Sequence, residues 1–226
     1  MFEQELSTIT VSISENQAIG IDWGVAHFLT LSNGSKIANP RLYQQYQCQL
    51  RVAQRSLARK KKRSQNFYKQ ARKLAKLQAK IARVRNDFQH KVSTDLVRSF
   101  DLIAIESLKV KNMSKSAKGD TEHHGKNVKA KSGLNRAIVD TAPSMFFDKL
   151  FYKAQWQGKA FIKVDAKYTS QRCHSCGYQS KENRISQSNF ECKKCGHTDN
   201  ADINAAKNIL ARAIASSRKR GALARA

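Results

Sequence analysis

Four cysteines in the last quarter of the sequence have the spacing of a metal-binding ribbon. Cys173 and Cys176 form one Cys-x2-Cys pair, and fifteen residues separate it from a second pair, Cys192 and Cys195; a glycine follows each pair. Four thiolates complete the tetrahedral coordination of Zn²⁺ and leave no open position for water. The pattern therefore predicts a structural zinc site. Two independent redox pairs are the alternative.

Three acidic residues stand where strands are expected to end or a helix to begin. Asp22 ends the apolar run AIGI, Glu106 ends LIAI, and Asp202 opens the helical segment INAAKNILARAI. Two strand ends and a helix start can converge in a fold. Carboxylates that converge would repel one another, unless they share divalent cations that activate water and stabilise the leaving oxygen of a phosphodiester. The three acids together favour Mg²⁺-dependent phosphodiester hydrolysis.

Each acid also has a purely structural interpretation when it is taken alone. Asp22 is typical of a turn, Glu106 of an exposed strand end, and Asp202 of a helix N-terminus, where the dipole favours negative charge. Asp165 and Asp199 are weaker candidates, and we expect them to be structural or supporting. Spacing alone does not decide whether the three stronger candidates meet.

The charge of the chain indicates a polyanionic partner. Its 226 residues include 42 Lys and Arg against 17 Asp and Glu, a formal net charge of +25. Nucleic acid is the first candidate for such a partner. No apolar run reaches membrane-spanning length, and the start MFEQEL does not resemble a signal peptide. We therefore expect a cytoplasmic, nucleoid-associated protein with no membrane partner and no small-molecule substrate.

The elements that must position these residues alternate between strands and helices. Alternating or continuous apolar runs predict strands, with the Asn33-Gly34 pair as a hairpin turn and Pro143 opening a later helix. The predicted strands cover residues 7–13, 18–24, 27–37, 102–106 and 160–165. The chain is thus expected to have an α/β fold.

A basic helical hairpin is predicted between the first and second groups of strands. From Arg41 to Asn86 the sequence has no acidic residue, while apolar residues recur every three or four positions. The break RKKKRSQN at residues 59–66 divides this stretch, so two long helices should fold back on each other over about 41–98.

The segment KVKNMSKSAKGDTEHHGKNVKAKSG, residues 109–133, is polar and rich in Lys and Gly. We expect a mobile loop that packs no core. Residues 112–133 could act as a lid over single-stranded substrate or serve as a solvated connector.

Four segments closely resemble the TnpB family of transposon-encoded RNA-guided endonucleases, also called insertion-sequence OrfB and related to type V CRISPR effectors. They read GIDWGVAHFLTLSNG, IAIESLKVKNM, YTSQRCHSCG and ECKKCGHTDNADINAAKNIL. The resemblance implies an RNase H-like, RuvC-like nuclease domain in three parts, with an inserted basic helical hairpin and an inserted zinc ribbon. It also implies that Asp22, Glu106 and Asp202 are the catalytic, Mg²⁺-binding carboxylates.

The same resemblance implies guide RNA and target DNA as partners, bound through the hairpin. The residues expected to contact nucleic acid there are Arg51, Arg55, Arg59, Lys60, Lys61, Lys62, Arg63, Arg72, Lys73 and Lys76. Backbone contacts of this kind do not depend on base sequence.

The family resemblance also predicts the domain boundaries. Residues 1–15 would be a remnant of the N-terminal wedge region, 16–169 the nuclease core, 170–198 the zinc ribbon, and 199–226 the last nuclease segment with a basic tail. From the resemblance we expect this sequence to lack most of the family's N-terminal targeting lobe, and a separately encoded N-terminal half is a further expected partner.

Three other interpretations stay open from the sequence. The chain could be a nuclease-inactive, truncated module that binds RNA or DNA, or a decayed transposase fragment. It could also be an unrelated basic zinc-ribbon protein such as a ribosomal component, although the acids at the strand ends would then have no explanation.

Overall fold

The computed structural model describes residues 17–120 and 122–223, with side chains described as far as Ser217. The predicted strand at 7–13 and the proposed wedge remnant at 1–15 lie outside the described residues.

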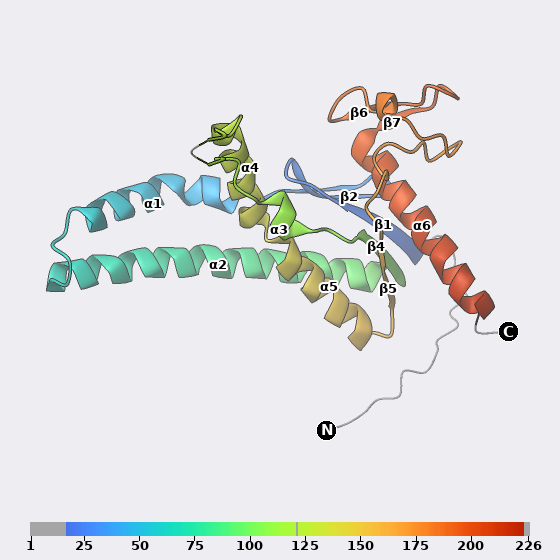
Figure 1. The fold of residues 1–226 in the computed structure, drawn as a ribbon. Helices are drawn as coiled ribbons and strands as arrows, with labels where there is room; N and C mark the ends of the chain where they lie inside the picture. The colour runs from blue at the N-terminus through green and yellow to red at the C-terminus, as the bar shows by residue number, and fades with distance from the viewer. Residues whose placement is uncertain (1–16, 121, 224–226) are drawn as a thin grey trace.

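A five-stranded mixed sheet forms the centre of the molecule (Figure 1). Its strand order is β3-β2-β1-β4-β5. An antiparallel meander of β1, β2 and β3 is extended by β4 and β5, which continue the sheet parallel to β1. The strand bounds are β1 Ala18–Trp23, β2 His27–Leu31, β3 Lys36–Ala38, β4 Leu102–Glu106 and β5 Ala160–Val164. The predicted α/β class is confirmed.

The Asn33-Gly34 turn divides the predicted strand at 27–37 into β2 and β3. Gly34 has a φ of 90°, a conformation that glycine adopts without steric cost, and its N–H donates to the Leu31 carbonyl at 3.0 Å. The predicted hairpin turn is therefore confirmed, with a third strand following it.

Two long helices form the predicted hairpin, α1 (Leu42–Ala58) and α2 (Gln65–Ser99). The Ser64 side chain begins α2 by accepting a hydrogen bond from the Phe67 N–H at 3.1 Å. Leu42, Leu50 and Ile81 are buried in the seam between the helices. Figure 1 shows that the hairpin extends far beyond the sheet, while the C-terminal part of α2 lies against it.

Helices cover the two faces of the sheet. Because strand side chains alternate, Ile19, Ile21, Ile103 and Ile105 share one face, where they pack in one core with residues of α2 and of α5 (Pro143–Trp156). The opposite face carries Ala18, Leu102 and Ala104, which pack against Ile209 and Ala213 of α6 (Ala201–Leu223). The described elements thus form three layers, with α2 and α5 on one side of the sheet and α6 on the other.

The prediction of a loop over 109–133 is wrong at both ends of the segment. The segment contains a short helix, α3 (Val110–Met113), and α4 (Val128–Thr141) begins before the predicted end of the loop. The polar composition hid α4 because only Ile138 and Thr141 of this helix are buried. Its packing is largely polar, and Asn135 donates to the Ser114 carbonyl at 2.9 Å.

A small ribbon precedes α6, as predicted. It holds a short 3-10 helix, η2 (Lys181–Asn183), and a two-stranded sheet of β6 (Asn189–Glu191) and β7 (Thr198–Asn200). Figure 1 places β6 and β7 beside the N-terminal end of α6. Within the described part of the chain, no helix is long and apolar enough to cross a membrane.

Candidate functional site

Asp22 and Glu106 lie side by side because their strands are adjacent and parallel. Ile21 of β1 pairs with Ile105 of β4, so the next residue on each strand is a carboxylate. Both acids alternate with the buried isoleucines and therefore point to the face that α6 covers. This is the carboxyl edge of the parallel strands.

Asp202 reaches the same edge from the first turn of α6. Asn200 caps this helix, since its Oδ1 accepts hydrogen bonds from the Asp202 N–H at 3.2 Å and the Ile203 N–H at 3.4 Å. Gly20 lets α6 approach β1 closely, because a Cβ there would lie 2.1 Å from the Ala206 carbonyl oxygen. The capped helix start is thus held against the sheet.

The three carboxylates line one cavity of about 270 Å³, together with Thr169, Arg184 and residues of the β1–β2 loop. The structure therefore brings together the three acids that the sequence singled out. Asp165 and Asp199 do not line this cavity. The Asp199 carboxylate is instead 2.7 Å from Lys207 Nζ, in keeping with the supporting role expected of it.

The electrostatics of the cavity disfavour three bare carboxylates. Burial raises the pKa of Asp22 well above its ordinary value, and the negative charges of Glu106 and Asp202 raise it further, against a lowering by Arg184. Burial also raises the pKa of Glu106, which a hydrogen bond from Thr169 opposes. The site is therefore suited to a partner of positive charge.

Two residues of the cavity were missed by the sequence reasoning. The Arg184 guanidinium is 3.5 Å from an Asp202 carboxylate oxygen, and the Thr169 hydroxyl donates to Glu106. Both lie in loops around the ribbon, far from Glu106 in the sequence. Neither has a local sequence signal, because a lone Arg or Thr in a loop is most often a solvated residue.

The four predicted cysteine ligands meet at one point of the ribbon. Their sulfur atoms lie within 4.8 Å of one another, with Cys173 and Cys195 3.8 Å apart and Cys176 and Cys192 3.5 Å apart. Tetrahedral zinc–sulfur bonds of about 2.3 Å require sulfur separations near 3.8 Å, so this cluster fits a zinc ion. It could hold a metal ion, as the sequence predicted.

The Cys192 thiol is prepared for the thiolate form that a metal requires. Burial opposes its ionisation, but the backbone N–H groups of Cys195 and Lys194, together with neighbouring thiols, lower its pKa to about 6. Burial and the neighbouring thiols raise the pKa of Cys173, and the neighbouring thiols raise that of Cys195 to about 12, so Cys192 is the thiol of this cluster that ionises most readily.

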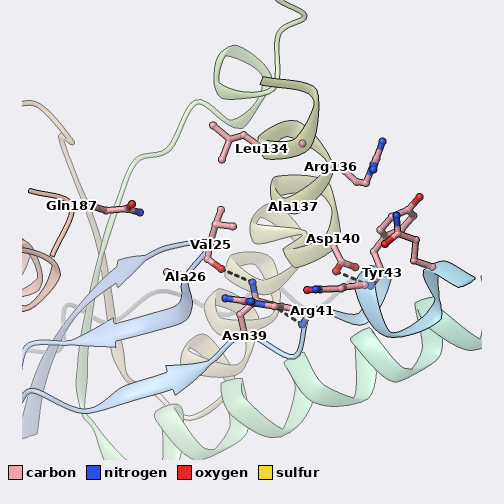
Figure 2. Close-up of a pocket in the computed structure, with 13 residues that line it drawn as sticks. Val25, Ala26, Asn39, Arg41, Tyr43, Leu134, Arg136, Ala137, Asp140 and Gln187 are labelled. Atoms are coloured by element: carbon pink, nitrogen blue, oxygen red, sulfur yellow. Dashed lines mark hydrogen bonds between the residues drawn. The ribbon is translucent and has the colours of Figure 1, made fainter. Parts of the chain in front are cut away.

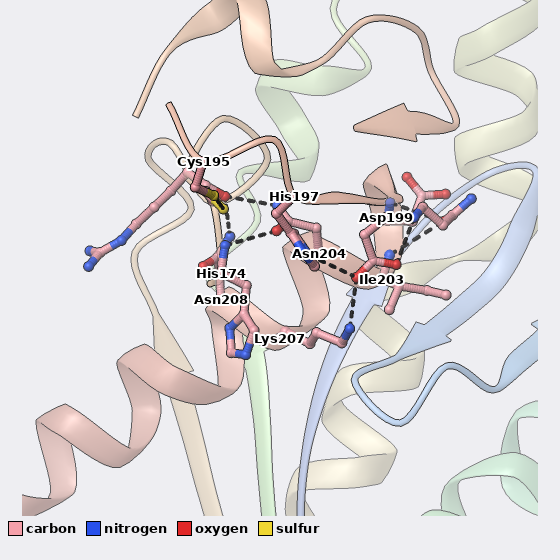
Figure 3. Close-up of polar contacts among 12 residues, drawn as sticks. His174, Cys195, His197, Asp199, Ile203, Asn204, Lys207 and Asn208 are labelled. Carbon is pink, nitrogen blue, oxygen red and sulfur yellow. Dashed lines mark hydrogen bonds and ion pairs between the residues drawn. The ribbon is translucent and has the colours of Figure 1, made fainter. Parts of the chain in front are cut away.

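Two buried asparagines of α6 fasten the ribbon to the helix that carries Asp202 (Figure 3). Asn204 accepts from the His174 N–H at 2.9 Å and donates to the Arg172 carbonyl at 2.8 Å. Asn208 donates to the Arg172 carbonyl at 2.7 Å and to the Thr169 carbonyl at 2.9 Å. The cysteine cluster and the acidic cavity therefore share one polar support.

The ten basic residues predicted to contact nucleic acid lie on the helical hairpin, and all of them are exposed. None of them lines the acidic cavity. Figure 1 shows the tip of the hairpin, where residues 59–63 lie, far from the sheet. The ten basic residues therefore lie together on the hairpin, away from Asp22, Glu106 and Asp202.

Comparisons with known proteins identify relatives over nearly the whole chain. The OrfB_IS605 family, described as "Probable transposase", matches residues 2–117, and the "Cas12f1-like, TNB domain" family matches residues 144–209. Two relatives are named "Putative RNA-guided DNA endonuclease": InsQ of Escherichia coli K12, 48% identical over 85% of this chain, and a Streptomyces pristinaespiralis protein, 36% identical over 93%. This chain spans about half of their length, 48% in each case.

Solved structures give the same fold. The chain resembles the protein of a Cas12f1-sgRNA-target DNA complex with a TM-score of 0.55, at 20% identity over 88% of this chain and 51% of the other. It resembles the protein of a CRISPR-Cas12f ternary complex with a TM-score of 0.56, at 20% identity over 91% of this chain and 40% of the other. With the first family match covering just over half of its residues, the chain belongs to the OrfB_IS605, or TnpB, family of probable transposases.

Proposed function

We propose that this chain is the catalytic portion of an RNA-guided DNA endonuclease, with a RuvC-like domain of RNase H type. Asp22, Glu106 and Asp202 would be its catalytic carboxylates. The observation that carries the proposal is their meeting in one cavity of about 270 Å³, although the chain separates them by up to 180 positions (202 − 22). The names of the relatives agree with this activity.

The residues of the cavity fit a pair of Mg²⁺ ions. Hard cations of this kind take carboxylate oxygens, and a bound cation would offset the burial that raises the pKa of Asp22 and Glu106 and the repulsion by neighbouring carboxylates that raises the pKa of Asp22 further. When bound there, Mg²⁺ would supply an activated water and charge stabilisation for the departing 3′ oxygen of a phosphodiester.

The chain's own residues would orient the groups around the scissile phosphate. Thr169 holds one oxygen of Glu106 by a hydrogen bond and so fixes the rotation of that carboxylate. Arg184 lines the cavity, and its guanidinium forms a long ion pair with Asp202 at 3.5 Å. The guanidinium could leave this carboxylate and bind a phosphate oxygen instead. Two fixed strands and a capped helix keep the acids in place, so little reorganisation is needed.

Zinc would have a separate, structural role in the ribbon. Four thiolates leave no open coordination position, so Cys173, Cys176, Cys192 and Cys195 would hold the fold of the loop and nothing else. Through Asn204 and Asn208 this loop supports the start of α6 and the Thr169 backbone. Zinc would therefore act on cleavage only by positioning residues.

Guide RNA and target DNA are the partners we propose, with the exposed basic hairpin holding phosphates of the guide or of its duplex with target DNA. The chain spans about half of its curated relatives. Recognition of a target would then need a further N-terminal portion, which a separately encoded half could supply. Such a protein would act in the cytoplasm, at the nucleoid.

The domain limits that we propose follow the elements. The nuclease core would run over 16–169 with the hairpin at 42–99, the ribbon over 170–198, and the last nuclease segment over 199–226. The ribbon would thus be inserted between β5 and α6, and the hairpin between β3 and β4.

Cleavage of end-labelled single-stranded DNA tests the proposal. We expect purified, zinc-loaded protein to cut in Mg²⁺ and not in EDTA. Asp202→Asn should reduce the rate by at least about 100-fold, because an amide neither neutralises nor coordinates a cation as a carboxylate does. Asp95→Asn, at an exposed acid of α2, is the matched control and should cut like the wild type.

Two results would overturn the nuclease proposal. One is the absence of Mg²⁺-dependent cutting by folded protein that carries one zinc ion, with and without added guide RNA. The other is cutting that survives Asp202→Asn. The first result, together with salt-dependent RNA binding, would favour the truncated binding module instead.

A further inference from the structure

The structure has a second hollow, here called the side pocket, whose lining residues Figure 2 shows. Its volume is about 450 Å³, within the range of about 300–1,000 Å³ typical of ligand sites. The walls come from the β1–β2 loop, the connection between β3 and α1, the first turns of α1, and α4. Gln187 of the ribbon also lines the pocket. Neither the proposed cleavage in the acidic cavity nor the proposed zinc site uses this pocket.

The side pocket combines flat and apolar surfaces. The Arg136 guanidinium lies over the Tyr43 ring, 5.3 Å from its centroid, and Figure 2 shows both side chains on the α1–α4 side of the hollow. Val25 and Leu134 add aliphatic surface, and Leu134 is 45% exposed. Aromatic rings and guanidinium planes are the groups on which nucleobases stack.

The charge of the side pocket favours an anion. Its one acidic lining residue, Asp140, is already occupied: one oxygen accepts from Arg85 at 2.8 Å and the other from the Tyr43 N–H at 2.8 Å. Among the described residues, no carboxylate pairs with the guanidinium of Arg41 or of Arg136. Two cations therefore face the hollow without a counter-charge, which suits a phosphate beside a base.

The walls of the side pocket are fixed before any ligand binds. Asn39 donates to the Val25 carbonyl at 2.7 Å and accepts from the Arg41 N–H at 3.0 Å, so it joins the β1–β2 loop to the start of α1. Arg41 itself has a φ of 47°, a strained conformation for a residue with a side chain. Strain that the surrounding contacts maintain is a frequent feature of binding sites.

The side pocket and the acidic cavity are adjacent, because Val25, Ala26 and Gln187 line both. We propose that the side pocket binds a nucleobase and its phosphate in a single strand of DNA, next to the bond that the acidic cavity would cut. This inference rests on the proposed nuclease function for its choice of ligand. A single strand fits better than a duplex, since only an unpaired base exposes both faces for stacking.

Gly133 offers a way to block the side pocket without touching the acids. It lies in α4, and a Cβ built there meets nothing within 4 Å. Gly133→Leu should therefore fill part of the hollow, while Gly133→Ala fills very little of it. Both substitutions raise helix propensity, so they are matched in their effect on α4.

Photo-crosslinking in EDTA is the test. Single-stranded DNA carrying 5-iodo-2′-deoxyuridine at successive positions is bound to the full chain and irradiated, and the labelled peptides are mapped by mass spectrometry. We expect Tyr43 to be labelled from one or two positions. Gly133→Leu should lower this labelling by at least about five-fold, as expected when one stacked base is displaced, and Gly133→Ala should leave it unchanged.

The outcomes separate this inference from the proposed function. Labelling of other aromatic residues without Tyr43, or labelling of Tyr43 that Gly133→Leu leaves intact, would overturn the side pocket as a base site. Arg136→Gln, which removes the stacked cation, repeats the test if Gly133→Leu does not fold. Crosslinking is measured in EDTA, which prevents cutting, and cleavage is measured separately in Mg²⁺. Labelling of Tyr43 together with no cleavage would refute only the nuclease proposal. Cleavage together with no labelling of Tyr43 would refute only the side pocket as a base site.

Discussion

At the scale of single residues, the acidic cavity is defined by three carboxylates. Bringing them together lowers the stability of the folded protein when they are ionised. Asp22 carries the clearest sign of this effect, because burial and two neighbouring carboxylates raise its pKa well above the ordinary value. A raised pKa means that the folded state holds this proton more tightly than the unfolded state does. The free energy of unfolding should then fall as the pH rises through the ordinary Asp range, until Asp22 has ionised in the folded state.

Asp22→Asn should therefore stabilise the metal-free protein while removing its activity. In EDTA near neutral pH we expect a higher free energy of unfolding for the variant, because the neutral amide avoids the cost of a buried carboxylate beside two other acids. The gain should shrink toward acid pH, where the native Asp22 is protonated. Urea denaturation at several pH values measures both effects.

A control and a metal titration complete this prediction. Asp95→Asn, at an exposed position, should leave the stability and its pH dependence unchanged. Mg²⁺ should raise the free energy of unfolding of the wild-type protein more than it raises that of the Asp22→Asn variant. Equal stabilisation of the two by Mg²⁺ would contradict the assignment of Asp22 as a cation ligand.

At the scale of elements, the close contact of α6 with β1 decides where Asp202 lies. A Cβ at Gly20 would lie 2.1 Å from the Ala206 carbonyl oxygen and 2.9 Å from the Leu210 Cβ. Backbone atoms of a packed helix cannot move aside cheaply, so any side chain at residue 20 must displace α6.

Gly20→Ala should consequently weaken the fold and the site together. We expect a loss of about 1–3 kcal/mol in the free energy of unfolding, the usual cost of overpacking, and a clear fall in Mg²⁺-dependent cleavage because Asp202 moves with the helix. Denaturation and cleavage rates provide the measurements. Gly133→Ala, in open space, is the matched control and should not lower stability; a Gly20→Ala protein with native stability would show that α6 packs differently.

The asparagines of α6 connect a second element, the ribbon, to the same helix. Asn204→Ala would leave the His174 N–H without its partner, whereas the Arg172 carbonyl would lose one of its two donors and keep Asn208. We expect a loss of about 1–3 kcal/mol, the cost of unsatisfied buried groups, and a lower cleavage rate although no proposed ligand has changed. Asn189→Ala, at an exposed ribbon position, should alter neither value. Thermal unfolding with and without a zinc chelator is the measurement, and an Asn204→Ala protein that unfolds like the wild type would contradict this coupling.

The elements that were predictable from the sequence are those with a strong local pattern. The buried strands around Ile19 and Ile103, the two hairpin helices and the cysteine ribbon all carry such a pattern, and each was found. Helix α4 was missed because long-range polar contacts hold it, among them the ion pair of Asp140 with Arg85 of α2. The three acids could be selected by their positions at element ends, whereas Arg184 and Thr169 reach the cavity only through the path of the ribbon loop.

At the scale of the whole molecule, the basic hairpin and the three acids of the cavity occupy different regions. Ten exposed basic residues run along a hairpin that extends away from the sheet (Figure 1), while the acids line the cavity at the carboxyl edge of β1 and β4. A long polyanion could therefore bind along the hairpin without bringing its phosphates to the acidic cavity. Binding and cutting should accordingly respond to different substitutions.

Replacing Lys60, Lys61 and Lys62 by Gln should weaken nucleic-acid binding without changing the fold. Each lysine that contacts a phosphate releases about one counterion, so the slope of log affinity against log salt should become shallower by about two to three. Lys115, Lys118 and Lys126, equally exposed between α3 and α4, form a matched triple whose replacement should alter the slope by less than one. Fluorescence anisotropy with a labelled RNA duplex over a salt series gives both slopes. Equal slopes for the two triples would mean that the hairpin contributes only its share of the general charge, and guide contacts would then have to be sought on the sheet side of the molecule.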